Sequence, residues 1–232
     1  TYYDDGVNGR IFFVAESFLY CLDALTGELI NSFGDGGKTT LNKGFERNTK
    51  NLFISVTTPG IIFENLLILG SRVLDSSNQK TIPGDIRAFN VLTGEIIWTF
   101  NTIPRPGEKG YNTWPKDSWR NEYLTVNSWG GFTLDQKNGI VFFGTGSPSY
   151  DHWGGNRVGD NLFGNCIIAL EAKTGKRIWH YQTVHHDLWD YDIPCPPNLV
   201  QVNVNGKLID AIAQPTKTGQ LFVLDRLTGN PI

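Results

Sequence analysis

The chain contains no methionine, little cysteine and no long apolar run. Only three of its 232 residues are cysteines. An odd number of cysteines without a Cys-x-x-Cys spacing argues against a disulfide framework and a cysteine zinc site, so we expect buried free thiols. The longest apolar runs, such as residues 140–143, are far shorter than the roughly 18 residues that a membrane-spanning helix needs.

Charge is also scarce, and it has no strong sign. The chain has 20 Lys and Arg against 23 Asp and Glu, a net charge of −3, and aromatic residues make up 12% of it. This balance argues against nucleic acid as a partner, and the aromatic content argues against disorder. Because the chain starts at Thr1 and lacks methionine, we expect it to be a piece of a longer protein. A missing signal peptide therefore says nothing about the compartment.

Glycine, in contrast, is abundant. It accounts for 26 of 232 residues, or about 11% against an average of roughly 7%. No Gly-X-Y period is present, which excludes collagen. Many glycines together with many aromatic residues indicate short strands joined by tight turns.

Four segments repeat one pattern, which is the strongest sign of organisation in the sequence. Each has an apolar strand, an acidic or amide residue, a Thr-Gly pair three residues later and usually a second apolar strand. The pattern predicts hairpins in which Gly adopts a positive φ and the acidic or amide side chain accepts backbone N–H groups. We expect Trp98 and Trp179 to stack between neighbouring units. The repeats cover residues 19–33, 86–100, 167–181 and 221–232.

Further short strands lie between the repeats, and no long helix is indicated. Added to the hairpins, these strands predict four-stranded antiparallel sheets stacked radially, which is an all-β propeller of about four blades in a single partial domain over residues 1–232. Unrelated hairpins in a sandwich are the alternative, which four copies in one register disfavour. The long inserts 101–120 and 147–165 are expected to be functional. The additional strands are expected at residues 10–14, 60–63, 66–69, 131–134, 140–144, 199–202 and 208–213.

Several strings are specific enough to resemble one family. The repeat resembles the tryptophan-docking motif of dehydrogenases that depend on pyrroloquinoline quinone (PQQ). The strings VNSWGG, TVHHDLWDYDIP and TKTGQLFVLDR, which start at residues 126, 183 and 216, are similar to its glucose and quinate branch. The resemblance implies an eight-bladed propeller with PQQ on the central axis, of which this chain would hold about four blades.

The segment 183–192 concentrates two His, three Asp and one Trp. Read alone, it is a polar loop anchored by Trp189, a set of oxygen ligands for a hard cation, or the source of a general base. The resemblance implies that Asp190 is the base. It would take the proton of the substrate hydroxyl while hydride passes to the C5 carbonyl of PQQ, and it is a further candidate ligand of the metal. Asp187 and Asp192 are expected to be structural, capping turns or pairing with backbone.

Two further residues carry the expected cofactor contacts. A lone lysine is usually a solvated charge, but Lys217 directly precedes an apolar strand, and the resemblance places it against the quinone oxygens of PQQ, where it would stabilise developing negative charge. Trp129 is followed by two glycines that would leave its ring face open. The resemblance makes it the floor under PQQ, and one more packing tryptophan is the alternative.

The resemblance also implies Ca²⁺ as a Lewis acid at the quinone. Its ligands here would be Asp75, Ser147 and Asp190. Ser147 stands where the family has Asn, and a hydroxyl is a weaker ligand than an amide oxygen, so a water ligand or Mg²⁺ stays open. Thr58 and Ser71 are candidate hydrogen-bond partners of the PQQ carboxylates. A vicinal disulfide of the kind found in some relatives is excluded, because no two cysteines are adjacent.

The resemblance thus predicts a PQQ-dependent oxidoreductase for a hydroxyl of a sugar, polyol or other small alcohol. Electrons would leave to a quinone or a cytochrome, and the longer protein would be periplasmic, with membrane association left open. Two alternatives remain: a non-catalytic propeller scaffold and a module that binds a protein through its loops. Neither needs Asp190, Lys217 and Trp129 at these places.

Overall fold

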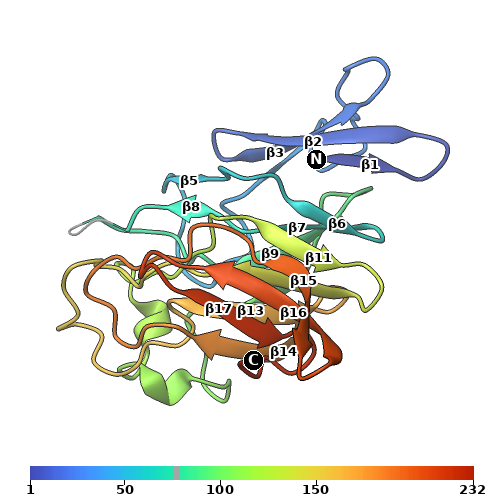
Figure 1. Ribbon diagram of the computed structural model, residues 1–232. Coiled ribbons are helices and arrows are strands. Elements are labelled where there is room, and N and C mark those ends of the chain that lie inside the picture. The colour runs from blue at the N-terminus through green and yellow to red at the C-terminus, as the bar shows by residue number, and fades with distance from the viewer. Residues whose placement is uncertain (76–78) are drawn as a thin grey trace.

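The structure is a computed structural model, and it describes residues 1–75 and 79–232. Antiparallel sheets follow one another in chain order, from the N-terminal sheet at the upper end of Figure 1 to the C-terminal sheet at the lower end. The predicted stack of four-stranded sheets is confirmed for three of the four large sheets. The first contains β1 (Tyr2–Asp4), β2 (Gly9–Ala15), β3 (Phe18–Asp23) and β4 (Lys38–Thr40), and the second contains β6 (Ile61–Phe63), β7 (Leu66–Leu69), β9 (Ile86–Asn90) and β10 (Ile96–Phe100).

The third and fourth sheets complete the stack. A separate two-stranded ladder pairs β5 (Ile54–Ser55) with β8 (Arg72–Val73) next to the second sheet. The third sheet contains β11 (Phe132–Asp135), β12 (Ile140–Gly144), β13 (Cys166–Glu171) and β14 (Arg177–Gln182), and the fourth contains β15 (Asn198–Val204), β16 (Lys207–Pro215) and β17 (Leu221–Asp225).

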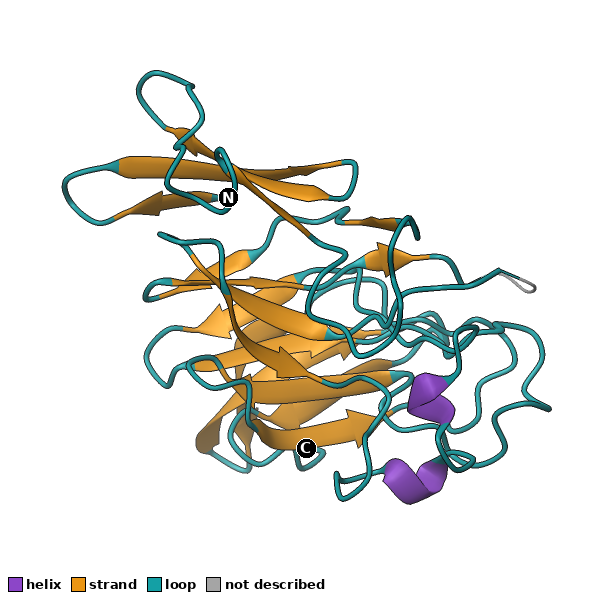
Figure 2. Ribbon diagram, turned by 180° about the vertical axis from the view of Figure 1, so that it is seen from behind, coloured by secondary structure: helices purple, strands orange, loops and turns teal. Residues whose placement is uncertain are grey.

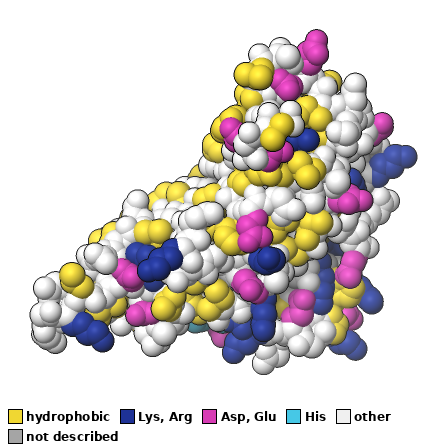
Figure 3. Space-filling model, turned by 90° about the vertical axis from the view of Figure 1, so that its right-hand side faces the viewer, with side chains coloured by type: hydrophobic (Ala, Val, Ile, Leu, Met, Phe, Trp, Pro, Cys, Tyr) yellow, Lys and Arg dark blue, Asp and Glu magenta, His cyan; other side chains and the backbone are white. Residues whose placement is uncertain are grey.

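Among the residues that the structure describes, helix is confined to two short 3₁₀ turns, at Tyr111–Thr113 and Ser118–Arg120, which Figure 2 shows among the loops. Both lie in the insert 101–120. In the described part of the chain, no helix is long and apolar enough to cross a membrane. On the face in Figure 3, Lys and Arg side chains lie among Asp and Glu side chains, as the balanced composition suggested.

Strand β7 and the first four residues of β12 are apolar at every position because both of their faces are buried. In β7, Leu66 and Ile68 pack into a core shared with the third sheet, while Leu67 and Leu69 pack into a core shared with the first sheet. In β12 the same alternation divides residues 140–143 between two cores. The period of two thus joins neighbouring sheets into a continuous stack. Cys21 and Cys166 are free and buried, as expected, whereas Cys195 is half-buried.

Three of the four Thr-Gly turns have the predicted chemistry. Asp23 Oδ1 accepts the amides of Leu25 and Thr26, each at 2.9 Å. Asn90 and Asp225 accept the equivalent amides of their own turns. In the third turn the Glu171 carboxylate accepts the hydroxyl of Thr174, and the turn amides bond to the Glu171 backbone carbonyl instead. The four glycines of these turns all have φ between 71° and 73°, which is the left-handed region that glycine enters at least cost.

The predicted stacking of tryptophan between units is also confirmed, and it determines how the sheets pack. The ring of Trp98 lies against Gly175 of the next turn, where a Cβ would be 2.6 Å from Cδ2 of the ring. Its indole N–H donates to Ala172 O at 3.1 Å. Trp179 repeats both contacts with Gly229 and Arg226 O. Each ring therefore closes over the bare backbone of the following hairpin.

The first and last repeats depart from the expected hairpin. Their second arms are reduced to single bridges, Leu22 with Leu29 and Leu224 with Pro231. Directly after the first repeat, three glycines at positions 34, 36 and 37 have positive φ and form the turn that leads into β4. The sheet is completed instead by β4, whose register pairs Phe18 with Thr40.

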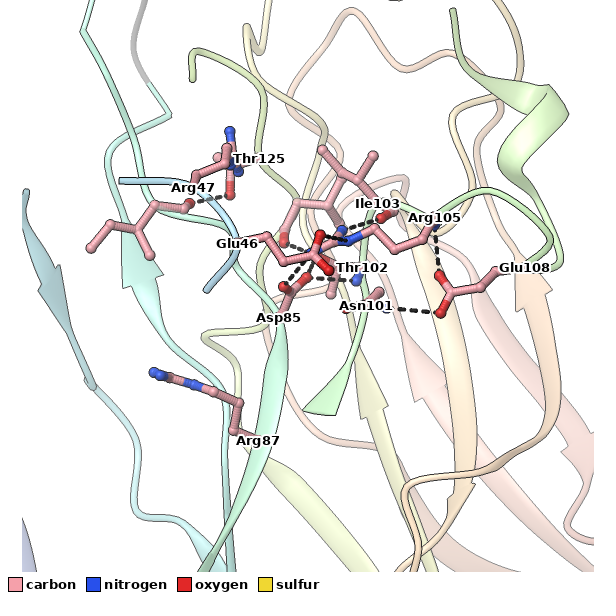
Figure 4. Close-up of polar contacts among 12 residues, drawn as sticks. Glu46, Arg47, Asp85, Arg87, Asn101, Thr102, Ile103, Arg105, Glu108 and Thr125 are labelled. Atoms are coloured by element: carbon pink, nitrogen blue, oxygen red, sulfur yellow. Dashed lines mark hydrogen bonds and ion pairs between the residues drawn. The ribbon is translucent and has the colours of Figure 1, made fainter. Parts of the chain in front are cut away.

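A buried polar network fastens the insert 101–120 to the second sheet (Figure 4). Asp85 Oδ1 accepts the amide of Thr102 at 2.9 Å, and its Oδ2 pairs with Arg105 at 3.2 Å. The hydroxyl of Thr102 donates to Val126 O at 2.7 Å. Arg87 is almost fully buried, which lowers its pKa to about 10, and it donates to Leu41 O and Lys43 O. The network thus fixes Val126, which leads directly into the site below.

We predict that Gly175→Ala destabilises the protein much more than Gly27→Ala. Both glycines have a similar positive φ, but a Cβ at Gly27 meets nothing within 4 Å, whereas a Cβ at Gly175 collides with Trp98. The left-handed backbone costs about 1 kcal/mol in either variant, and overpacking adds about 1–3 kcal/mol at Gly175. Denaturant unfolding measures the difference. Equal losses of free energy would contradict the tryptophan-docking account.

Candidate functional site

A cavity of about 540 Å³ opens where loops from several sheets meet. It brings together four of the seven predicted site residues: Thr58, Asp75, Trp129 and Asp190. The other residues that line it are Thr57, Arg72, Asn127, Asp151 and Asp192. The predicted residues are far apart in the sequence, so their convergence is a property of the fold.

Lys217 joins this group through two carboxylates. Its Nζ lies 3.0 Å from Asp190 Oδ2 and 3.2 Å from Asp192 Oδ2, and it also donates to Asp190 O at 2.9 Å. Partial burial works to lower the pKa of Lys217, but the hydrogen bond to Asp190 and the charge of Asp192 outweigh it and raise the pKa. The ammonium group is therefore held in its charged form.

Asp192 has more contacts than the structural role expected of it. Its Oδ1 accepts the amide of Ser147 at 2.7 Å, as a structural residue would, while its Oδ2 faces Lys217. Burial raises the pKa of Asp192, and the neighbouring charge of Asp190 adds to this effect. The Ser147 amide and Lys217 act in the opposite direction. Asp192 thus belongs to the ionic group that surrounds Asp190.

Asp187 is structural, as predicted. Its side chain is 1% exposed, and its carboxylate caps the loop that carries Asp190 by accepting the amides of Trp189 and Tyr191 at 2.9 and 2.7 Å. Asp190 itself has a φ of 55°, a left-handed conformation that aspartate adopts more readily than most residues.

Trp129 is held by its backbone. Its carbonyl accepts the hydroxyl of Thr58 at 3.2 Å, so Thr58 makes this contact as well as lining the cavity. The backbone geometry also requires the two glycines that follow Trp129, apart from any role in leaving the ring face open. A Cβ on Gly130 would lie 2.6 Å from the carbonyl carbon of Pro194, so the Asp190 loop can approach only because this residue is glycine. Gly131 has a φ of 96°.

The remaining predicted residues, Ser71 and Ser147, lie beside the cavity lining. The backbone carbonyl of Ser71 accepts a hydrogen bond from the side-chain Nδ2 of Asn127 at 3.0 Å. The buried hydroxyl of Ser71 has no hydrogen-bond partner within the described residues. Ser147 donates its hydroxyl to Asp187. A metal contact from Ser147 stays a prediction, and it would have to be made while that hydroxyl is shared with Asp187.

Four carboxylates, from Asp75, Asp151, Asp190 and Asp192, line this cavity together with a single cationic side chain, that of Arg72. Burial, reinforced by the charges of the other three, raises the pKa of Asp151 to about 7. Within residues 1–75 and 79–232, no three His, Cys, Asp or Glu side chains are grouped so as to hold a metal ion by themselves. The side-chain oxygen of Asn127 is a neutral candidate metal ligand, because the Nδ2 of the same side chain already donates to Ser71 O.

Sequence reasoning missed Arg72, Asn127 and Asp151 as cavity residues. Asn127 stands two residues before Trp129, inside the string already singled out, and Asp151 lies in an insert expected to be functional. Thr57 and Arg72, two further lining residues, stand directly beside the predicted Thr58 and Ser71, although the short strand that holds Arg72 was not predicted.

Comparisons with known proteins agree on one family. A family model described as "PQQ: Glucose/ethanol/alcohol dehydrogenase, beta-propeller domain" matches residues 1–232. The quinoprotein glucose dehydrogenase of Escherichia coli is 37% identical over 217 residues, covering 93% of this chain and 27% of that protein. The quinate/shikimate dehydrogenase (quinone) of Acinetobacter baylyi is 37% identical over 232 residues, covering 99% of this chain and 27% of that protein.

Solved structures share the fold. The crystal structure of the quinohemoprotein alcohol dehydrogenase from Comamonas testosteroni matches with a TM-score of 0.80 and 27% identity, covering 96% of this chain and 33% of that one. The chain therefore spans about a quarter to a third of the length of the proteins it matches.

Asp151 gives a prediction for the dependence of stability on pH. Because its pKa is about 7 in the folded protein and about 4 in the unfolded chain, the folded state binds this proton more tightly. Its contribution to stability is present at low pH and is lost as pH rises through 7. The free energy of unfolding of Asp151→Asn, relative to that of the wild type, should therefore increase from pH 5 to pH 8. The expected increase is on the order of 1 kcal/mol once solvent screening is taken into account.

Thermal unfolding at the two pH values, with a chelator present, measures this gain. Asp160→Asn, which changes an exposed aspartate of the same loop, is the control and should show no such change. A stability difference between Asp151→Asn and the wild type that is the same at both pH values would contradict the raised pKa.

Proposed function

Since the chain belongs to the PQQ-dependent glucose, ethanol and alcohol dehydrogenase β-propeller family, we propose that it forms the catalytic part of an enzyme that oxidises a hydroxyl group of a sugar, polyol or other alcohol. One observation carries the proposal. Asp190, Lys217 and Trp129, from three separate loops, converge at one cavity. A propeller that served only as a scaffold or a protein-binding module would not need this convergence.

The residues at the cavity fit PQQ, a planar quinone with three carboxylates. Trp129 offers an aromatic ring, Arg72 a cation, and Thr57 and Thr58 hydroxyl groups. Ser71 keeps a buried, unpartnered hydroxyl beside the same segment. We propose that these side chains hold the cofactor, which when bound supplies the electrophilic carbonyl that accepts hydride. Aromatic stacking and charge-assisted hydrogen bonds are the interactions that such a ligand requires.

Asp190 is the proposed base. Its Oδ2 is paired with Lys217, and a carboxylate in that position can take the proton of a substrate hydroxyl as the C–H bond breaks. Lys217 has three N–H donors, and Asp190 O, Asp190 Oδ2 and Asp192 Oδ2 accept them. A contact from Lys217 to a quinone oxygen therefore requires that one of these bonds be exchanged.

The donor set also fits a divalent cation. Carboxylates and an amide oxygen are the ligands that Ca²⁺ prefers, and the acidic cavity lacks enough cationic side chains to balance it. We propose that Asp75 and Asp190 bind Ca²⁺, with Asn127 as an additional ligand beside the earlier candidate Ser147. Mg²⁺ is the alternative. The ion would polarise the acceptor carbonyl as a Lewis acid.

The remaining parts of the proposal rest on the family. We propose that the complete enzyme is periplasmic and passes electrons to a quinone or a cytochrome. One relative is named a quinate/shikimate dehydrogenase (quinone) and another a quinohemoprotein alcohol dehydrogenase, which supports both kinds of acceptor.

We predict that Asp190→Asn and Lys217→Ala separate proton transfer from cofactor binding. In the complete enzyme, Asp190→Asn should keep its PQQ affinity and lose about 10²–10⁴-fold in turnover, because an amide cannot accept the proton. Lys217→Ala should lower turnover and also weaken PQQ binding, because it removes a cation near the quinone and leaves two carboxylates unpaired.

Titration of PQQ into each apo variant with Ca²⁺ present, followed by dye reduction, measures both quantities. The control is Asp160→Asn, which should behave like the wild type. Wild-type turnover of Asp190→Asn at saturating PQQ would exclude Asp190 as the base.

A further inference from the structure

We propose that Asp187 is the positioning residue of the site: it fixes the backbone on both sides of Asp190 and so aims the carboxylate of the base. This inference rests on the proposed function, in which Asp190 accepts the substrate proton. Asp187 does not line the cavity and acts only through Asp190.

The Asp187 carboxylate binds the backbone on both sides of Asp190. Its Oδ1 accepts the amide of Trp189 at 2.9 Å, and its Oδ2 accepts the amide of Tyr191 at 2.7 Å. These amides belong to the residues directly before and after Asp190. One carboxylate therefore fixes the chain on either side of the base and holds Asp190 at its left-handed φ of 55°.

The Asp187 carboxylate is itself anchored by two side chains of another segment. Asn165 Nδ2 donates to Asp187 Oδ2 and to Tyr191 O, each at 2.9 Å. The hydroxyl of Ser147 donates to the same Oδ2. Ser147 follows the end of β12, and Asn165 directly precedes β13, so the reference frame for the loop is the third sheet.

Arg157 binds the backbone carbonyl of Asp187. Its side chain is fully buried, and its guanidinium donates to Asp187 O at 2.5 Å and to Tyr150 O at 3.1 Å. It also binds Asn161 Oδ1 at 2.8 Å. The insert 147–165, which carries Asp151, is thereby tied to the loop of the base.

Asp187 differs from the aspartates that merely cap turns in this chain. Asp23 and Asp225 are half-buried and accept the amides two and three residues ahead. Asp187 is buried, reaches the amides two and four residues ahead, and receives two side chains from another segment. Lys217 then binds the Oδ2 and the carbonyl oxygen of Asp190. The base is thus held at its backbone by Asp187 and at its side chain by Lys217.

Loss of Asp187 should displace the base while leaving the cofactor residues in place. We expect Asp187→Ala in the complete holoenzyme to lower kcat by about 10²-fold, the size of effect that a 1 Å misplacement produces. KM and the Kd for PQQ should change by less than about threefold. Asp187→Asn should be intermediate, because one oxygen still accepts Tyr191 N, while its NH₂ cannot accept Trp189 N.

A double-mutant cycle distinguishes positioning from general damage. Asp187→Ala and Asp187→Asn are each combined with Asp190→Asn, and Asp160→Asn is the control in both backgrounds. When two residues act through the same step, the losses of kcat from their single substitutions do not multiply in the double variant. Once Asp190→Asn has removed the base, neither Asp187 variant should lower kcat further, and Asp160→Asn should have no effect in either background.

Three outcomes overturn the proposal. If the losses from Asp187 and Asp190 multiply, or if PQQ affinity falls together with kcat, Asp187 stabilises the site generally and does not aim the base, although the proposed function stands. If Asp190→Asn alone keeps wild-type turnover, the proposed function and this inference fail together. Should Asp187→Ala not fold, the same cycle with Asp187→Asn decides, and a coupled loss of about tenfold supports positioning.

Discussion

The packing of the second sheet on the third, and of the third on the fourth, depends on one contact, a tryptophan ring closed over the bare backbone of a turn glycine. Trp98 on Gly175 and Trp179 on Gly229 repeat it with the same ring-to-backbone approach and the same indole hydrogen bond. Because the contact fixes the offset between neighbouring sheets, it also fixes where their loops meet. The site exists at that meeting point, and none of its residues is close in sequence to the tryptophans that place it.

A second constraint is electrostatic. Burying several carboxylates together is unfavourable unless cations compensate them, and the cavity has four carboxylates. Part of the balance comes from Lys217, which pairs with two of them. Burial, together with the uncompensated charges of the other carboxylates, raises the pKa of Asp151 to about 7. A divalent cation bound in the cavity would compensate these negative charges. The cluster of carboxylates is therefore unfavourable for the bare chain but suited to binding a metal ion.

The sequence predicted what is local and what repeats. The turns, the buried central strands and the docking tryptophans follow from periodicity and from Thr-Gly chemistry, and residues 66–69 and 140–144 were assigned with their observed bounds. The second arms of the first and last repeats were wrong, because each arm makes only a single bridge to the strand before it. At the site, motif residues such as Asp190 and Lys217 carried a signal. Asp151 lies in an insert expected to be functional and Arg72 lies next to Ser71, but only long-range packing, which no local pattern records, brings them to the cavity.

The central claim is that this cavity holds PQQ over Trp129. Equilibrium titration of PQQ into the complete apo protein with Ca²⁺, read by the quinone absorption band, tests it most directly when the wild type is compared with Trp129→Ala. The account predicts saturable binding to the wild type and an affinity about tenfold lower for the variant, as expected for the loss of one aromatic stacking contact. Equal affinities in the two proteins, or no saturable binding to the wild type, would contradict it.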